Sequence, residues 1–269
     1  MQIIEKFIQG KRANQDLCED GWVVTPHFAA VVDGSTSKVA GRAGGREAMK
    51  LVCSALQTLP VEADKTQMLE HLTRTLAAHN LPESDRHAEY RLTCSAVIFS
   101  YYHRVVWLVG DCHCRFAGQT YDNYKLVDEI LTRIRCEIAH FLLSQGYGPQ
   151  EFLDHDPARA MILGELREMT NFQNDPNPHN PFRYVVLDGT PIDATMVPEI
   201  QVPAEVDELI LASDGYPTLF DTWHESEKHL QQLLVDDPLC IQDNPATKCY
   251  LTGNHSFDDR CFVRLKINE

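Results

Sequence analysis

Two apolar, strand-like runs of this chain each end in an aspartate followed by a glycine, and they lie far apart in the sequence. The first ends at Asp33-Gly34 in AAVVDGST, and the second ends at Asp214-Gly215 in LILASDGY. A third acidic point, Asp258-Asp259 in SFDDRCFVRL, precedes the last apolar run. A carboxylate at a strand end can project an oxygen ligand from a sheet, while glycine leaves room for neighbouring backbone. If the fold brings these points together, they could hold a pair of hard metal ions.

Short apolar runs rich in valine, isoleucine and aromatic residues predict the strands. They cover residues 22–24, 28–32, 94–101, 104–109, 184–187, 208–212 and 260–267. Apolar residues at helical spacing predict helices over residues 45–59, 65–79, 124–145 and 157–169. Runs of strands broken by runs of helices favour a layered α+β fold over an alternating parallel sheet.

The segment 171–182, NFQNDPNPHNPF, is rich in proline and asparagine and is predicted to be a loop. An apolar run follows at once, and the aspartate motifs lie on both sides of the whole segment. We therefore expect a single domain over residues 1–269, with a helical and loop insertion at about residues 122–182. A chain of this length can bury a core without structural metals, so we expect any metal to serve chemistry.

The formal net charge of −15 argues against general binding to nucleic acid or to an anionic membrane, because both require a positive field. The charge is compatible with divalent cations or basic protein partners, although a solvated acidic surface explains most of the excess. No apolar run is long enough to span a membrane. The nine cysteines are irregularly spaced and the amino terminus lacks a secretory stretch, which together predict a reduced, cytoplasmic protein. The sequence does not indicate the oligomeric state.

Further acidic residues extend the set of strand-end carboxylates. Asp111 follows the apolar run in VVWLVGDCHCRF, and Asp16 lies in KRANQDL after the cations Lys11 and Arg12. Oxygen ligands of this kind suit Mg²⁺ or Mn²⁺ rather than zinc, which prefers histidine and cysteine. A single Asp-Gly pair is also an ordinary turn signal, so each pair alone is weak evidence.

Several other chemistries are disfavoured by the motifs. Cysteine-based phosphatases need an arginine six positions after the nucleophile, and none of the nine cysteines has one. The nucleotide-binding G-x-x-x-x-G-K-[ST] loop is absent from the sequence. Residues 112–114, Cys-His-Cys, could suggest zinc, but adjacent strand residues point to opposite faces. The glycine-rich segment 41–46 is read as the flexible start of a helix rather than as a phosphate-binding loop.

The order of the motifs resembles that of the PPM-type, or type 2C (PP2C-like), metal-dependent protein serine/threonine phosphatases. The matching segments, in order, are KRANQD, VVDGST, RLTCSAVIF, VGDCHCRF, LASDGYPTLFD and FDDRCFVRLK. They span nearly the whole chain. The resemblance implies a four-layer α-β-β-α sandwich with two central antiparallel sheets flanked by helices. It also implies a hydrolase that acts on phosphorylated proteins.

The resemblance implies specific metal ligands in this chain. Asp33 would bridge two metal ions, and the carbonyl of Gly34 would bind one of them. Asp214 and Asp258 would complete the coordination of the other ion. Asp111 would belong to a third, more weakly bound ion. The ions would be Mn²⁺ or Mg²⁺.

The phosphate-binding part departs from the family pattern. Asp16 matches the acid of the amino-terminal motif and would act through metal-bound water. The arginine that usually precedes this acid by five positions is Lys11 here, with Arg12 beside it, so either cation could bind the phosphate. Residues 35–37, Ser-Thr-Ser, follow the first Asp-Gly pair, so a histidine acid is absent there and a metal-bound water could substitute.

Two functions of different class follow. The first is hydrolysis of phosphoserine and phosphothreonine in proteins by a water that bridges two Mn²⁺ or Mg²⁺ ions and attacks phosphorus in line, without a phospho-enzyme intermediate. The second is a non-catalytic regulatory or binding module with the same fold, which would use the insertion at 122–182 as its interface. The metal-ligand aspartates favour the first function, whereas Lys11 and the altered Asp111 motif keep the second open.

Overall fold

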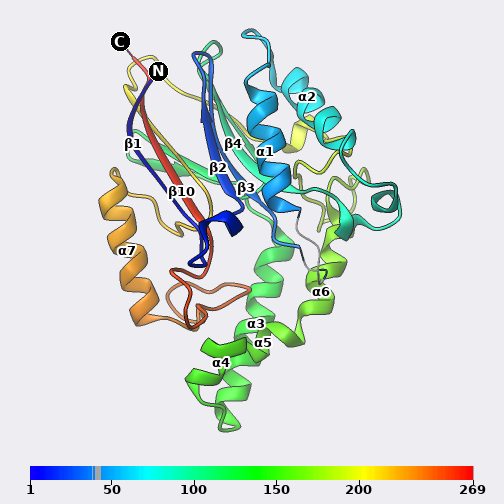
Figure 1. Ribbon diagram of the computed structural model, residues 1–269, viewed down its shortest axis with the longest axis vertical. Helices are drawn as coiled ribbons and strands as arrows, with labels where there is room; N and C mark the ends of the chain where they lie inside the picture. The colour runs from blue at the N-terminus through cyan, green and yellow to red at the C-terminus, as the bar shows by residue number, and fades with distance from the viewer. Residues whose placement is uncertain (38, 40–43, 269) are drawn as a thin grey trace.

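The computed structural model of the chain describes residues 1–37, 39 and 44–268, and it shows two antiparallel sheets that lie between layers of helices (Figure 1). Helices α1 (Gly45–Leu56) and α2 (Lys65–Ala77) cover one sheet. Helix α7 (Trp223–Asp236) covers the other. The α+β class and the four-layer α-β-β-α arrangement that the resemblance implies are therefore confirmed.

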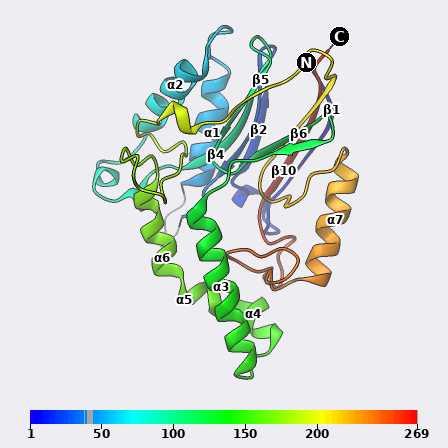
Figure 2. The ribbon, with the colours of Figure 1, turned by 180° about the vertical axis from the view of Figure 1, so that it is seen from behind.

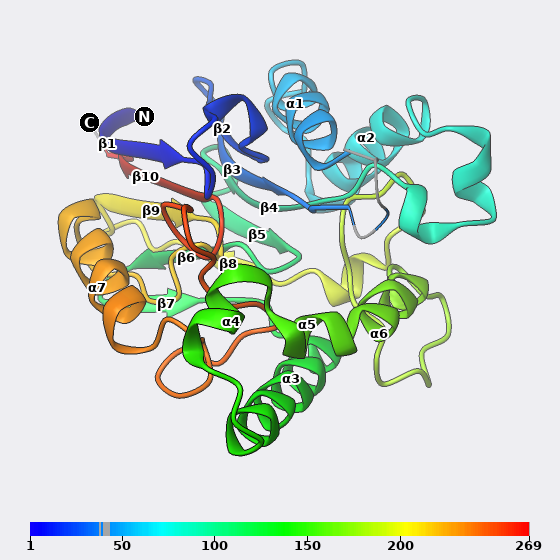
Figure 3. The same ribbon diagram turned by 60° about the horizontal axis from the view of Figure 1, so that its bottom comes forward.

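Each sheet has five strands, and every neighbouring pair is antiparallel. In spatial order, the first sheet consists of β1 (Gln2–Gln9), β10 (Arg260–Lys266), β9 (Glu208–Ala212), β6 (His113–Phe116) and β7 (Gln119–Tyr121). The second sheet consists of β2 (Asp20–Val24), β3 (Phe28–Gly34), β4 (Cys94–Ser100), β5 (Val105–Val109) and β8 (Glu199–Gln201). Figure 3 shows the two sheets edge-on, with α1 and α7 on their outer sides.

The central strands are apolar on both faces because both faces are covered. In β3, Ala29 and Val31 enter the core between the two sheets. Their neighbours Ala30 and Val32 pack instead against α1 and α2. Alternate strand residues point to opposite faces, so an unbroken apolar run is what a doubly covered strand requires.

The segment between β7 and β8 contains helices α3 (Leu126–Ser144), α4 (Pro149–His155), α5 (Pro157–Met161) and α6 (Leu163–Glu168). These helices project from one end of the sandwich (Figure 2). They have two apolar clusters of their own, and one of these includes Leu239, Ile241 and Cys249 from a distant part of the chain. The insertion is thus packed against the loop that follows α7.

Several predicted elements are corrected by the structure. The helix predicted at 157–169 is two short helices, because Ile162 leaves helical geometry at φ −106° and ψ 9°. Residues 184–187 are not a strand and make only isolated bridges, Tyr184 with Gln173 and Leu187 with Cys94. Of the glycine-rich segment 41–46, residues 41–43 lie outside the described part of the chain, and α1 begins at Gly45.

Some elements were not predicted because their apolar pattern is weak. Strand β1 lies at a sheet edge and has no fully buried residue. Helix α7 buries only Ser226 and Leu230. Among the described residues, no helix is both long and apolar enough to cross a membrane.

Candidate metal centre

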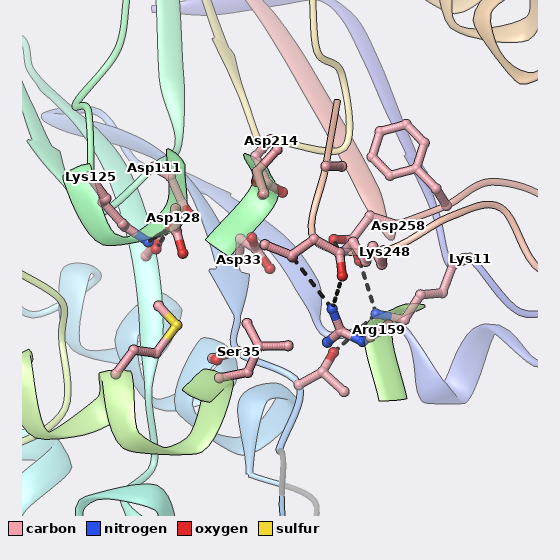
Figure 4. A pocket seen from close by; sticks show the side chains of 18 of the residues that line it. Lys11, Asp33, Ser35, Asp111, Lys125, Asp128, Arg159, Asp214, Lys248 and Asp258 are labelled. Carbon is pink, nitrogen blue, oxygen red and sulfur yellow. Dashed lines mark hydrogen bonds and ion pairs between the residues drawn. The ribbon is translucent and has the colours of Figure 1, made fainter. Parts of the chain in front are cut away.

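Three carboxylates from both sheets converge at one end of the sandwich. Asp33 ends β3, Asp111 follows β5, and Asp214 follows β9. One oxygen atom from each lies within 4.8 Å of the others, and Figure 4 shows the three side chains gathered at the wall of a pocket. The structure thus brings together three strand-end aspartates that are far apart in the sequence.

The glycines of the two Asp-Gly pairs are required by close backbone contacts. A Cβ atom on Gly34 would collide with the backbone of Gly45 at the start of α1. A Cβ atom on Gly215 would collide with the carbonyl of Asp259. No side chain larger than hydrogen fits at either position, so the Asp-Gly pairs here mark tight approaches between segments rather than isolated turns.

Asp33 and Asp214 are half-buried carboxylates with little cationic compensation in the described chain, since Lys248 and Lys125 act on Asp214 only without forming an ion pair. Neither carboxylate forms an ion pair there, and Oδ1 of Asp214 is buried without a hydrogen-bond partner. Burial, together with the charges of Asp20 and Asp214, raises the pKa of Asp33 well above its usual value. Burial and the charge of Asp111 raise the pKa of Asp214. A divalent cation would relieve this repulsion, and the all-oxygen donor set fits Mg²⁺ or Mn²⁺.

Asp111 differs from the other two because it already has a cationic partner. Its Oδ2 lies 2.6 Å from Nζ of Lys125, which immediately precedes α3. Its Oδ1 accepts a hydrogen bond of 2.5 Å from Ser95. Burial alone would raise the pKa of Asp111, but Lys125 and Ser95 hold that pKa well below its usual range.

Asp258 lies apart from the three-carboxylate cluster and is bound by two lysines. Its Oδ1 is 2.9 Å from Nζ of Lys11, and its Oδ2 forms an ion pair with Lys248. Lys11 also donates to Thr36 at 3.0 Å and lies 4.0 Å from Glu19. Burial, followed by the charge of Lys11, lowers the pKa of Lys248 to about 8.

The structure does not bring Asp16 to this centre. Asp16 lies in a single turn of 3₁₀ helix, its side chain is 92% exposed, and its nearest cation is Arg46 at 3.9 Å. Asp20, four residues later, is buried and lies opposite Asp33 in the β2–β3 pair. Burial raises the pKa of Asp20 to about 7, against a hydrogen bond from Ser213. The pairing register of β2 with β3 is the signal that could have identified Asp20.

The centre opens into a cavity of about 610 Å³ that also has a cationic wall. Lys11, Arg12, Arg159 and Lys248 all line it. Arg159 comes from α5 and donates to the carbonyl of Thr247 at 2.6 Å. Sequence reasoning missed Arg159 because nothing in the insertion indicated which of its cations faces the cavity.

A buried arginine fixes the loop that carries Lys248. The guanidinium of Arg135 in α3 is fully buried and donates to three carbonyls of the segment 239–246, at 2.9 to 3.1 Å. It also forms an ion pair with Asp156 at 3.0 Å. Asp156 in turn accepts a hydrogen bond from the backbone N–H of Cys249 at 3.0 Å. The insertion therefore determines the path of the chain on both sides of Lys248.

The Cys-His-Cys segment has a structural role. Cys112 and Cys114 enter the core between the two sheets, whereas the ring of His113 contacts the carbonyl of Ser213 at 3.0 Å. The expected opposite orientation is confirmed. In the part of the chain that the structure describes, the only group with metal-ligand geometry is that of Asp33, Asp111 and Asp214.

The two antiparallel sheets carry half-buried carboxylates at their strand ends and face cations across the cavity, an arrangement that suits a metal-dependent hydrolase. A family model described as Protein phosphatase 2C matches residues 6–236. The chain belongs to the protein phosphatase 2C family, whose members are metal-dependent serine/threonine phosphatases. The predicted family and enzyme class are confirmed.

Solved structures agree on the fold. A bacterial serine phosphatase is 15% identical, with a TM-score of 0.50 over 99% of this chain and 98% of that chain. Serine/threonine phosphatase Stp1 from Staphylococcus aureus is also 15% identical, with a TM-score of 0.50 over 100% of this chain and 96% of that chain. A comparison with curated proteins found no match.

Proposed function

We propose that the chain hydrolyses phosphoserine and phosphothreonine in proteins with two Mn²⁺ or Mg²⁺ ions held by Asp33, Asp214 and the carbonyl of Gly34. The observation that carries the proposal is the pair of half-buried carboxylates, Asp33 and Asp214, that form no ion pair in the described chain. When bound, the ions supply Lewis acidity and lower the pKa of a coordinated water. The cytoplasmic location remains a prediction from the cysteine content.

The neighbours of the two aspartates keep them in place. The hydroxyl of Ser213 donates to buried Asp20 at 2.6 Å and accepts from the backbone N–H of Cys261 at 2.8 Å. These bonds tie the chain just before Asp214 to β2 and β10. Asp20 lies across the strand pair from Asp33, so one hydroxyl supports both sides of the proposed centre.

Asp258 completes the proposed ligand set, as the family resemblance implies. Both of its oxygens are bound by lysines in this structure, so an ion at Asp258 must displace one of them. We expect the ion to displace Lys248, because burial and the adjacent Lys11 lower its pKa to about 8. A lysine that loses its proton more readily forms a weaker ion pair with Asp258.

The phosphate of the substrate would meet the cationic wall of the cavity. Lys11 is already engaged by Asp258, Thr36 and Glu19, which leaves the guanidinium groups of Arg12 and Arg159 as the better phosphate donors. A guanidinium group can bind two phosphate oxygens in parallel, which a lysine cannot do. We therefore assign phosphate binding to Arg159 together with Arg12.

The test is turnover of p-nitrophenyl phosphate and of a phosphothreonine peptide with Mn²⁺. We expect activity that EDTA abolishes and that is lost in Asp214→Asn. The matched control is Asp236→Asn, which makes the same change on the exposed face of α7 and should leave the rate intact. If Mn²⁺-dependent turnover of the native chain is no greater than that of Asp214→Asn, the enzyme proposal is wrong.

A further inference from the structure

Asp111 is the one member of the acidic cluster whose two oxygens both have donors in the chain. Ser95 donates to Oδ1 at 2.5 Å, and Lys125 donates to Oδ2 at 2.6 Å. Oδ1 of Asp214, in contrast, has no hydrogen-bond partner among the described residues. The cluster therefore combines carboxylates that need an external cation with one that does not.

The ammonium group of Lys125 is held in a cage built from three parts of the chain. Its side chain is only 9% exposed, and Asp128 of the first turn of α3 lies 3.6 Å from Nζ. The ring of Tyr184, which follows the insertion, faces Nζ at 5.2 Å from its centroid. An aromatic face stabilises a cation, and a desolvated ion pair with such partners resists separation.

A small divalent ion cannot share Asp111 with this ammonium group. Mg²⁺ requires oxygens at about 2.0–2.1 Å in near-octahedral geometry and gives up its waters reluctantly. The Lys125 ammonium lies against Oδ2, and the Ser95 hydroxyl occupies Oδ1. An ion at Asp111 would therefore have to displace at least one of these donors, and an ion on Oδ2 would lie against the charge of the ammonium group.

We propose that Lys125 is a built-in cation of the centre, which occupies the place of a third ion at Asp111 and limits the centre to two divalent ions. The proposal rests on the proposed two-ion function, since it concerns how many ions the same cluster accepts. It also gives the insertion a defined part in the centre. Lys125 stands at the amino-terminal end of α3, so Asp111 gains its cationic partner when the insertion packs against the sandwich.

The experiment counts bound ions, independently of turnover. Calorimetric titration of the metal-free chain with Mn²⁺, with electron paramagnetic resonance to count free Mn²⁺, should give two ions per native chain. Lys125→Arg keeps the charge and should also bind two ions. Lys125→Met removes the internal cation and should bind a third. Lys228→Met, an exposed lysine of α7, is the matched control and should remain at two.

The possible outcomes separate the two proposals. Three ions in the native chain, or two in a folded Lys125→Met variant, would overturn the role of Lys125 but leave the two-ion function standing. A native chain that binds no Mn²⁺ would overturn both. If Lys125→Met does not fold, the native count decides, since only a chain already limited to two ions agrees with the proposal.

Discussion

One cavity contains two kinds of carboxylate, and their difference shows where external ions are needed. Asp33 and Asp214 lie half-buried next to each other and form no ion pair in the described chain. Asp111 and Asp258 face the same cavity but are neutralised by Lys125, Lys11 and Lys248. In the first pair, the two carboxylates repel each other, and a metal ion would reduce this repulsion. In the second pair, the lysines already neutralise the carboxylates, so no metal ion is needed.

The largest effect is expected when an uncompensated carboxylate is removed. Asp33→Asn should lower Mn²⁺-dependent turnover by more than about a hundredfold, since even outer partners of metal ligands cost about 10–100-fold. The same variant should raise the melting temperature of the metal-free chain, because a buried like charge disappears. Turnover assays and thermal unfolding in EDTA measure the two effects. A metal-free variant that melts below the native chain would contradict the comparison.

Removal of a compensated carboxylate should change stability in the opposite direction. Asp111→Asn leaves the ammonium group of Lys125 enclosed without its main partner. We expect the free energy of unfolding to fall by about 2–4 kcal/mol. Urea denaturation of the metal-free chain measures it. The double variant Asp111→Asn with Lys125→Met should recover part of the loss, and an unchanged stability of the single variant would be evidence against a strong internal pair.

The cationic wall is expected to act on the substrate rather than on stability. Arg159→Ala should lower kcat/KM for a phosphothreonine peptide by about 10–100-fold, because a charge-assisted hydrogen bond contributes about 1.5–3 kcal/mol. Arg159→Lys should recover only part of this, since lysine cannot bind two oxygens in parallel. Steady-state kinetics give the values. Arg167→Ala, elsewhere in the insertion, is the control, and equal losses in both variants would remove Arg159 from phosphate binding.

Lys248 tests whether an ion must compete for Asp258. In Lys248→Met, one oxygen of Asp258 loses its partner while Lys11 keeps the other. Mn²⁺ should then bind more tightly on the order of tenfold, which corresponds to about 1.4 kcal/mol. Calorimetric titration measures the affinity. Weaker binding in this variant would show that Lys248 supports the ions instead of competing with them.

The smallest effect is a pH dependence of the metal-free chain. Burial raises the pKa of Asp20 to about 7 and that of Asp33 well above its usual value, so both bind protons more tightly in the folded state. Their contribution to stability is complete below their unfolded pKa and is lost as the pH rises through the folded pKa.

Melting temperatures in EDTA should therefore fall between pH 6.5 and pH 7.5, and saturating Mn²⁺ should reduce the fall. The upper limit avoids Lys248, whose pKa is lowered to about 8 and whose titration has the opposite effect. The lower limit avoids the titration of His113, whose pKa is lowered to about 4 by burial. Below pH 6.5 this histidine makes the melting temperature rise with pH. Asp20→Asn should show a smaller fall than the native chain. A melting temperature that rises over this interval would contradict the uncompensated state of the cluster.

The sequence was sufficient to predict the carboxylates that end apolar strands. Asp33, Asp111 and Asp214 each terminate such a run, and two antiparallel sheets packed face to face bring those ends together. Strand pairing is less visible, because register depends on contacts between segments. This explains why the motif pointed to Asp16 and gave no sign of Asp20, which the β2–β3 register places beside Asp33.

The cationic partners could not be predicted for a different reason. Lys125 and Arg159 belong to the insertion, and Lys248 to a loop without regular secondary structure. The sequence pattern does not indicate the direction of these long side chains, because tertiary packing determines it. The same holds for residues 184–187, whose apolar pattern resembles a strand although they make only isolated bridges. Tyr184 and Val186 pack with α3 and α6, whereas Val185 and Leu187 pack with α1 and α2.

Arg135 has a consequence for any attempt to shorten the protein. Its guanidinium group donates hydrogen bonds of 2.9 to 3.1 Å to three carbonyls of the loop after α7. These bonds connect the loop to helix α3 of the insertion rather than to a strand or helix of the sandwich. A truncation that joins β7 directly to β8 would remove the Arg135 donor from all three carbonyls, although the carbonyl of Cys240 would keep the backbone N–H of Ala246, and we expect it to loosen the loop that carries Lys248. We therefore expect the sandwich and its insertion to unfold together, and a version shortened by trimming the insertion to lose the geometry of its cationic wall.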